Sequence, residues 1–452
     1  MNGCAIDYTG QKMTSRSPLR QFVIPILMAI AVCTTPLNPA NAQSSSLESQ
    51  LVIPASSIGS NGSAPRAHSN ISVVVPSSRL AINEAPAAQG PPYPGYSAET
   101  PASLACVYNL VPASPQSTGC NPSVVTMVPA PQKSTLAMIA VVVACHDPTV
   151  AKDLEKFSKQ FGLAAPLDLT VSNTSTNLPD SCTGEERQGW NEEASRDIEY
   201  VHAMAPAAAL YLVEAQSSAL DDLLAAVQIA NSLVRRYNTG IVVNPWGIAE
   251  SSRELADDFY FSSTPGVIYL AAAGDVQGVV QYPATSPYVI AVGGTSLSRD
   301  PETGFYLLES AANDGQGDAT GGGPSQFEPI PAYQQTYANI AGTHRVVPDV
   351  SAIGDVGHGV WVYSGVDNGW IVTGGTGLST TLWAAITADA GSFYGKTDAS
   401  AFELQQIYRG VGSTSHFNLI TTGTCGPYNG YIATGEYNMC TGLGSPNGYS
   451  GK

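Results

Sequence analysis

A glycine-rich corner leads into a run of small and apolar residues in the segment Thr373-Gly374-Gly375-Thr376-Gly377-Leu378-Ser379-Thr380-Thr381-Leu382-Trp383-Ala384-Ala385. Alanine and leucine favour a helix, so the segment predicts a helix that begins directly after the corner. This build is typical of the turns that present a nucleophilic serine at the start of a helix. At the corner, where that serine is expected, the chain has Gly377.

Short apolar runs alternate with helical patterns upstream of this corner. The run Met138–Cys145 reads MIAVVVAC and predicts a buried strand, and the apolar residues between Val150 and Phe161 then recur at helical spacing. Further strands are predicted at Ala209–Ala215, Ile241–Asn244, Val267–Ala273 and Tyr288–Val292, and further helices at Leu220–Leu233 and Arg253–Phe261. Apolar strands separated by helices imply an α/β fold in which helices cover both faces of a parallel sheet.

The composition suits one large, acidic domain. The 452 residues are 43% apolar and carry a net charge of −17. Because no strongly basic patch is present, nucleic acid is excluded as an expected partner. Only 12% of residues are charged, against roughly 25% in an average protein. A low density of charge together with a net negative charge is typical of a protein that works at low pH.

The N-terminus has the pattern of an export signal. Lys12, Arg16 and Arg20 precede an apolar run, Phe22–Cys33, and Ala40-Asn41-Ala42 fits a cleavage site for residues 1–42. The alternative is an uncleaved anchor, although the run is short for a membrane span. Once the signal is removed, we expect a secreted or periplasmic protein that is not held in a membrane.

The rest of the chain is expected to form two parts. Residues 43–96 are rich in Ser, Pro, Ala and Asn and predict a flexible linker or a vestigial pro-segment. Residues 97–450 are expected to form the folded domain. After signal cleavage six cysteines remain, which is an even number in an exported chain. They allow 15 pairings, and proximity favours Cys106–Cys120 and Cys425–Cys440, which leaves Cys145 and Cys182.

Two groups of carboxylates are candidates for chemistry. Glu193 and Asp197 are four residues apart in a predicted helix and therefore share one face. A close carboxylate pair raises one pKa, so that one acid is ionised while the other holds a proton. The alternative is a solvated acidic start of the helix. Asp275 follows a predicted buried strand, where ligand sites of parallel sheets lie, but it could equally cap a turn.

Taken together, these segments resemble the sedolisin, or serine-carboxyl peptidase, family. The blocks that carry the resemblance are Asp153-Leu154, Gly162-Leu163, Glu193–Glu199, His202–Pro206, Leu212–Ala215, Asn244–Gly247, Ala273–Asp275, Tyr282–Ala284, Gly293–Thr295, Gly321–Gly323, Val347–Ala352 and Thr441–Pro446. The resemblance implies a subtilisin-like fold in which Glu193 is the general base, Asp197 orients it, and Asp275 donates a proton to the oxyanion.

The chain departs from this family at the nucleophile. Gly377 takes the place of the serine, and Thr381 replaces a proline of the same motif. Ser379 is the only local candidate for a substitute. It lies two residues further along the helix, which is about 200° of rotation, so we expect its hydroxyl to point away from Glu193.

The calcium site that the resemblance implies is also changed. The two aspartates of the family correspond here to Asn418 and Asn438, which are neutral. Because calcium affinity depends on the charge of the ligands, we expect weak calcium binding or none, and no other cofactor.

Three hypotheses for the function follow. The first is an exported sedolisin-like protein without its nucleophile, a pseudopeptidase that keeps a cleft for a peptide or protein ligand. The second is an active acid endopeptidase, a serine-type hydrolase that uses Ser379. The third is a structural surface module. We expect a monomer in each case.

Overall fold

The structure is a computed structural model that describes residues 50–59, 66–75, 90–93, 98–130, 137–174, 182–235, 240–315, 318–391, 399–426 and 431–452. The chain divides into residues 1–46 and a unit from Leu47 to Lys452. The predicted export signal, residues 1–42, lies outside the described residues, and so does its cleavage site.

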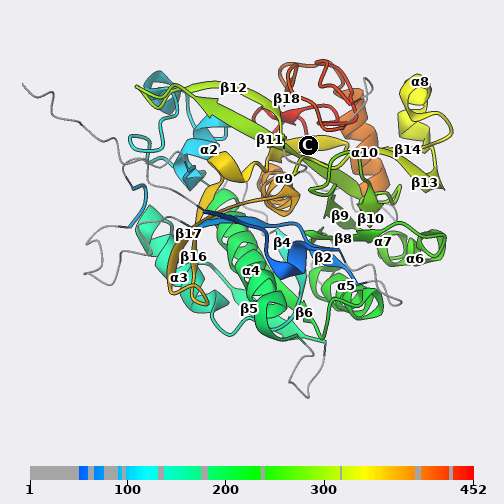
Figure 1. Ribbon diagram of the computed structural model, residues 1–452, viewed down its shortest axis with the longest axis horizontal. Coiled ribbons are helices and arrows are strands. Elements are labelled where there is room, and N and C mark those ends of the chain that lie inside the picture. Colours follow the sequence, from blue (N-terminus) through cyan, green and yellow to red (C-terminus); the bar gives the residue numbers. More distant parts are fainter. Residues whose placement is uncertain are drawn as a thin grey trace, which may run out of the picture. The chain divides into compact units, whose positions relative to one another are not determined.

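A mainly parallel sheet crosses the unit from Leu47 to Lys452 (Figure 1). Its strands run in the order β12 (Tyr306–Ala311), β11 (Ile290–Arg299), β9 (Val267–Ala272), β7 (Gly240–Asn244), β4 (Met138–Ala144), β6 (Ala209–Ala215) and β5 (Leu169–Asn173), and β15 (Val350–Ile353) also pairs with β11. Every pairing is parallel except that of β12 with β11. All residues of β4, β7 and β9 are buried, as expected for parallel strands with both faces covered.

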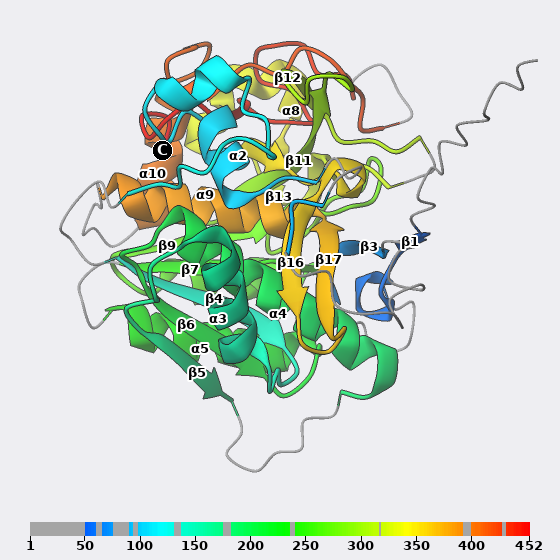
Figure 2. The ribbon, with the colours of Figure 1, turned by 90° about the vertical axis from the view of Figure 1, so that its left-hand side faces the viewer.

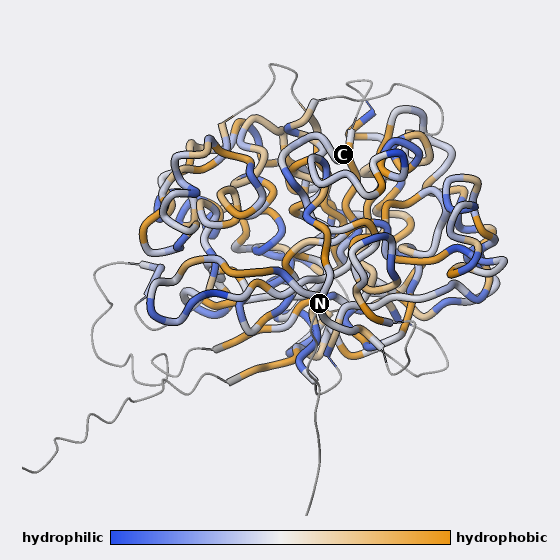
Figure 3. Tube along the Cα trace, turned by 90° about the horizontal axis from the view of Figure 1, so that it is seen from above, coloured by the Kyte–Doolittle hydropathy of each residue, from blue (hydrophilic) through white to orange (hydrophobic). Residues whose placement is uncertain are grey.

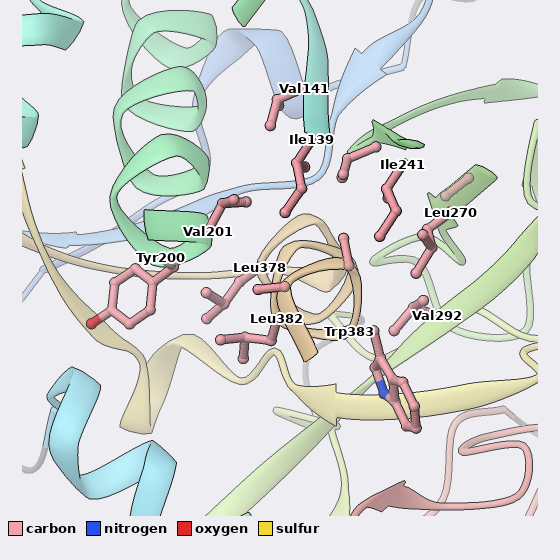
Figure 4. Close-up of a cluster of buried hydrophobic side chains, with 14 of the residues drawn as sticks. Ile139, Val141, Tyr200, Val201, Ile241, Leu270, Val292, Leu378, Leu382 and Trp383 are labelled. Carbon is pink, nitrogen blue, oxygen red and sulfur yellow. The ribbon is translucent and has the colours of Figure 1, made fainter. Parts of the chain in front are cut away.

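Two long helices pack together against this sheet. They are α4 (Gly184–Met204) and α9 (Thr376–Ala390), and α3 (Val150–Phe161) packs against α4. Figure 4 shows Val201 of α4 and Leu378 of α9 on the side of Ile139 of the central strand β4, whereas the ring of Tyr200 is turned away from the central strands. Helix α5 (Leu220–Val234) packs against β4, β6 and β7, and α10 (Ala399–Arg409) packs against β9. The expected α/β subtilisin-like fold is confirmed.

Shorter elements complete the described chain. The helices are α2 (Pro101–Val107), α6 (Glu254–Asp257), α7 (Phe259–Ser262) and α8 (Ala338–Ala341). The strands are β8 (Trp246–Ala249), β10 (Gln281–Tyr282), β13 (Gly323–Pro329), β14 (His344–Val347), β16 (Val360–Ser364), β17 (Gly369–Gly374), β18 (Phe417–Asn418) and β19 (Ser445–Pro446). In Figure 3 the hydrophilic stretches lie mainly at the outer turns of the trace. No helix in the described part of the chain is long and apolar enough to span a membrane.

The N-terminal part of the fold differs from the expectation. Residues 43–96 are predicted to be a flexible linker or a vestigial pro-segment, and the flexible linker is not what the structure has, since β1 (Gln50–Val52), β2 (His68–Ser69) and β3 (Ser72–Val75) belong to sheets of the domain. Strand β3 lies between β1 and β17 in a four-stranded sheet (Figure 2). The physical reason is the run Ser72–Val75, whose consecutive valines favour a paired strand. The folded domain therefore begins well before residue 97.

Three disulfides join the six cysteines of the described chain. They are Cys106–Cys120, Cys145–Cys182 and Cys425–Cys440. The two pairings that proximity favoured are present, together with the pairing that they leave. Disulfides are consistent with an oxidising, extracellular location.

Buried carboxyls accumulate around α6 and β13. Glu254 and Glu328 are 2% and 1% exposed, and Asp258 is 8% exposed. Burial raises the pKa of Glu254 and of Glu328 to about 8 each, and that of Asp258 to about 6. Neighbouring carboxyls, including Glu250 beside Glu254, raise these pKa values further. The folded protein therefore keeps protons that the unfolded chain releases at a lower pH.

We predict that the free energy of unfolding falls as pH rises from about 4 to about 8, because a raised carboxyl pKa stabilises the fold only while the proton is bound. The thermal midpoint should fall by about 5 °C or more over this range. Calorimetry at both pH values checks this. The double substitution Glu254→Gln and Glu328→Gln should flatten the profile, and an unchanged slope would contradict the assignment to these two residues.

Candidate functional site

An arginine lies between the two candidate acids of α4. Arg196 Nη2 lies 2.8 Å from Glu193 Oε1, and Arg196 Nε lies 2.7 Å from Asp197 Oδ1. All three side chains are fully buried. The helix brings them together because Glu193 and Arg196 are three residues apart on one face. The two acids do share this part of the helix, but an intervening guanidinium bonds both, and they do not form an isolated pair.

Burial and the arginine act on these acids in opposite directions. Burial raises the pKa of Glu193 well above its usual value, Arg196 lowers it, and Asp197 raises it further. Burial also raises the pKa of Asp197, against the lowering effect of Arg196. Burial opposes the charge of Arg196 itself, but the two carboxyls raise its pKa. The guanidinium therefore stays charged at every pH at which the protein is folded.

Gly377 lies at the start of α9, close to this group. A Cβ atom added to Gly377 would lie 2.4 Å from Arg196 Nη2 and 2.5 Å from Glu193 Oε1. Real Cβ atoms do not come this close to other heavy atoms. A side chain at residue 377 would therefore require Arg196 and Glu193 to move.

Asp275 lies at the same corner, directly after β9. Its Oδ1 accepts a hydrogen bond from the Thr376 backbone N–H at 2.7 Å, and the Thr376 hydroxyl lies 3.1 Å from the Gly274 nitrogen, whose N–H donates to it. Burial raises the pKa of Asp275, and the hydrogen bonds from Thr376 lower it. The fold therefore places Asp275 beside the residue that precedes Gly377, as expected for the end of a parallel strand.

Ser379 is directed elsewhere. Its hydroxyl lies 2.9 Å from the carbonyl oxygens of both Ala352 and Ile353, on β15. Ser379 is fully buried. Because this hydroxyl is hydrogen-bonded to carbonyls of β15, it is not placed to give its proton to Glu193 and attack a substrate.

Asn70, from the segment expected to be flexible, crosses the site. Its carbonyl oxygen accepts from Arg196 Nη1 at 3.2 Å and from the Gly377 N–H at 3.3 Å. Its own N–H donates to Glu193 Oε1 at 3.3 Å. A pocket of about 160 Å³ lies alongside and is lined by His68–Ser72 together with Asp275, Val276 and Asp318, among others.

Sequence reasoning missed Arg196 and Asn70. The signal for Arg196 was present, because a residue three positions after Glu193 shares its helical face. No local signal pointed to Asn70, whose partners are more than 100 residues away in the sequence.

Asn418 and Asn438 both make hydrogen bonds within the chain. The Asn438 side-chain oxygen accepts hydrogen bonds from the N–H groups of Cys440 and Thr441, at 3.0 and 2.9 Å. The Asn418 amide donates to Pro446 O at 2.8 Å. The Asn438 side chain thus holds a local turn, whereas that of Asn418 links β18 to β19, and neither carries the negative charge that calcium prefers. Within the described residues, no group of three or more His, Cys, Asp or Glu side chains is arranged to hold a metal ion.

The chain was compared with known proteins. No family model matches it. It is 32% identical over 326 residues to kumamolisin from Bacillus sp. (strain MN-32), which covers 65% of this chain and 56% of kumamolisin. It is 27% identical over 328 residues to sedolisin from Pseudomonas sp. (strain 101), which covers 66% of this chain and 53% of sedolisin. The chain thus spans about half the length of these curated relatives.

A solved structure of Pseudomonas sedolisin, a serine-carboxyl proteinase complexed with two molecules of pseudo-iodotyrostatin, matches with a TM-score of 0.61. The sequence identity is 23%, and the match covers 77% of this chain and 95% of the solved chain. The parallel sheet and this likeness define an α/β protein of subtilisin-like fold. By sequence, the chain is similar to kumamolisin and to sedolisin over about two thirds of its own length.

We predict that Gly377→Ser alone produces no peptidase activity and destabilises the protein by about 1–3 kcal/mol, because the new atoms collide with Arg196 and Glu193. Casein digestion and thermal unfolding check this. Gly59→Ser is the control, since a Cβ there meets only a carbon of His68 at 3.8 Å. Hydrolysis by the Gly377→Ser protein would contradict the crowding of this position.

Calcium should leave the thermal midpoint unchanged, because the amides of Asn418 and Asn438 bind neighbouring parts of the chain. Asn438→Ala should destabilise the protein by about 1–3 kcal/mol, equally with calcium and with a chelator. Isothermal calorimetry that detects tight calcium binding by the unmodified protein would overturn this prediction.

Proposed function

We propose that this chain is an exported sedolisin-family protein that does not hydrolyse peptides and keeps its cleft as a polypeptide-binding site. The observation that carries the proposal is the pairing of Gly377 with Arg196: one residue lacks a side chain, and the other fills the vacated space. By the family resemblance, Glu193, Asp197 and Asp275 would be the general base, its partner and the oxyanion donor.

Without a nucleophile these acids cannot complete acyl transfer. Covalent catalysis needs an oxygen or sulfur that attacks the substrate carbonyl and a base that takes its proton. Removing the nucleophile from a triad costs on the order of a millionfold in turnover. In addition, Glu193 already accepts hydrogen bonds from Arg196 and from the Asn70 N–H, so its Oε1 is engaged when no substrate is present.

Two observations support binding of a polypeptide. The backbone N–H and C=O of Asn70 are both hydrogen-bonded inside the site, so the site recognises an extended main chain. Residues 68–69 and 72–74 of the chain itself already pair there along one edge of β8 and one edge of β17. An extended segment that adds to such edges gains affinity from main-chain hydrogen bonds. The disulfides and the signal pattern support export.

The alternative is an active endopeptidase that uses Ser379. The two hydrogen bonds from Ser379 to β15 carbonyls disfavour it. A structural module without a functional cleft is the third candidate. The burial of Glu193, Arg196 and Asp197 disfavours that reading, because burying three titratable side chains is costly and their hydrogen bonds converge on this site.

We expect the purified protein to leave casein intact at about pH 3–5, the acid range expected for an endopeptidase whose base is a carboxylate, because Gly377 provides no nucleophile. We also expect no covalent adduct with a peptide aldehyde, because that capture needs a nucleophile. Mass spectrometry of the intact protein checks for the adduct, with an active sedolisin as positive control. An adduct on Ser379, lost in Ser379→Ala, would favour the endopeptidase.

A further inference from the structure

One continuous segment, His68–Val75, joins two separate sheets across the site. Its first half pairs with β8, where His68 lies opposite Gly247 and Ser69 opposite Trp246. Its second half pairs with β17, where Ser72 lies opposite Gly374 and Val73 opposite Thr373. Both pairings are antiparallel, and β2 and β8 lie side by side in Figure 1. The segment therefore runs through the site as an added strand, the way an extended peptide binds to strand edges.

The segment passes from one sheet to the other at Asn70. There its backbone bonds the side chains of Arg196 and Glu193 and the backbone N–H of Gly377, and does not pair with a strand. The Asn70 carbonyl accepts from Arg196 Nη1 and from the Gly377 N–H. Arg196 Nη1 also donates to the carbonyl of Gly374, the last residue of β17, at 3.0 Å. Arg196 thus connects the added strand to the strand beside it, and the same guanidinium bonds both acids of α4.

The Asn70 side chain enters a pocket that matches an amide. Its Nδ2 donates to the Pro245 carbonyl at 2.8 Å, and its Oδ1 accepts from Gln281 Nε2 at 3.2 Å. Gln281 is itself oriented by a 2.8 Å bond from Nε2 to the Ala272 carbonyl. A Cβ at Gly247 would lie 2.0 Å from the Gln281 side chain, so glycine there makes room for this glutamine. The pocket offers one acceptor and one donor, and an aspartate would put a second acceptor against Pro245 O.

We propose that His68–Val75 is a built-in ligand of the cleft. Arg196 holds the backbone of this segment where the family has a serine side chain. The cleft prefers an extended peptide with asparagine in the pocket formed by Pro245 and Gln281. This inference rests on the proposed function in one respect: a site that holds its own chain in this way must not cut it. Because the segment is part of the same molecule, its effective concentration is high. A free peptide must displace it before it can bind.

The first test is hydrogen exchange measured by mass spectrometry on the full chain, which reports the protection of the amides in residues 69–74. In Arg196→Met we expect these amides to exchange on the order of tenfold faster, while those of β4 change little. Arg345→Met is the matched control. Arg345 is also fully buried and bonds Asp349 at 2.7 Å, but its hydrogen bonds go to residues 284–289, 346 and 349 and not to the segment.

The second test addresses the pocket. Asn70→Asp should also release residues 69–74 by on the order of tenfold in exchange rate, because the added acceptor faces Pro245 O. Asn109→Asp is the control, since Asn109 is exposed and contacts Asn447. The Asn70→Asp protein should bind an eight-residue peptide with the sequence of residues 67–74 more tightly than it binds the analogue of that peptide in which leucine replaces the asparagine.

The outcomes separate this inference from the proposed function. Residues 69–74 that exchange freely in the unmodified protein, or that stay equally protected in Arg196→Met and Asn70→Asp, would overturn the built-in ligand. Release in Arg345→Met as large as in Arg196→Met would show that any loss of a buried arginine frees the segment, and would overturn the role of Arg196. Casein hydrolysis by the unmodified protein would contradict the proposed function. The exchange result would then decide the built-in ligand without reference to that function.

Discussion

A single buried cation, the guanidinium of Arg196, determines how the centre of this molecule is arranged. It bonds Glu193 and Asp197 on its own helix, the carbonyl of Asn70 between β2 and β3, and the carbonyl of Gly374 at the end of β17. Each ion taken from water into a protein costs of order several kcal/mol. That cost is offset only where the donors and acceptors are paired, and Arg196 has partners on all three of its nitrogens. The group is therefore one unit, because the loss of any member leaves a buried charge or a buried carbonyl without its hydrogen-bond partner.

The absence of a side chain at residue 377 is part of the same arrangement. A serine at this position would need the space that the guanidinium and Glu193 occupy. Arginine at 196 and glycine at 377 are thus physically complementary, whichever arose first. Asp275 remains bonded to the backbone of Thr376, so the corner itself keeps its shape. The backbone of the corner is thus held by Asp275, while Arg196 and Glu193 occupy the space beside Gly377.

The strand that covers the site depends on this chemistry as well. Residues 68–75 gain main-chain hydrogen bonds from β8 and β17, but at Asn70 the neighbouring strands leave a gap that Arg196, Glu193 and the Gly377 N–H fill. Buried backbone groups need partners. A cleft that supplies these partners to its own chain is closed to other peptides unless residues 68–75 leave it. The accessibility of the cleft therefore depends directly on whether this segment stays ordered.

Local patterns in the sequence were enough to predict the alternation of strands and helices, the helix after the glycine corner, two disulfides by proximity, and the positions of Glu193, Asp275 and Ser379 on their elements. These features depend on periodicity, spacing and residue type, which neighbouring residues carry. The arrangement at the centre was not predictable in this way. Asn70 meets Glu193 across 123 residues of sequence and Arg196 across 126, and the segment that carries it looked flexible because its composition is polar and its valine run is short. Its pairing with β17, and the direction in which the Arg196 side chain points, are decided only when distant strands come together, because a strand edge has no partner until the chain folds.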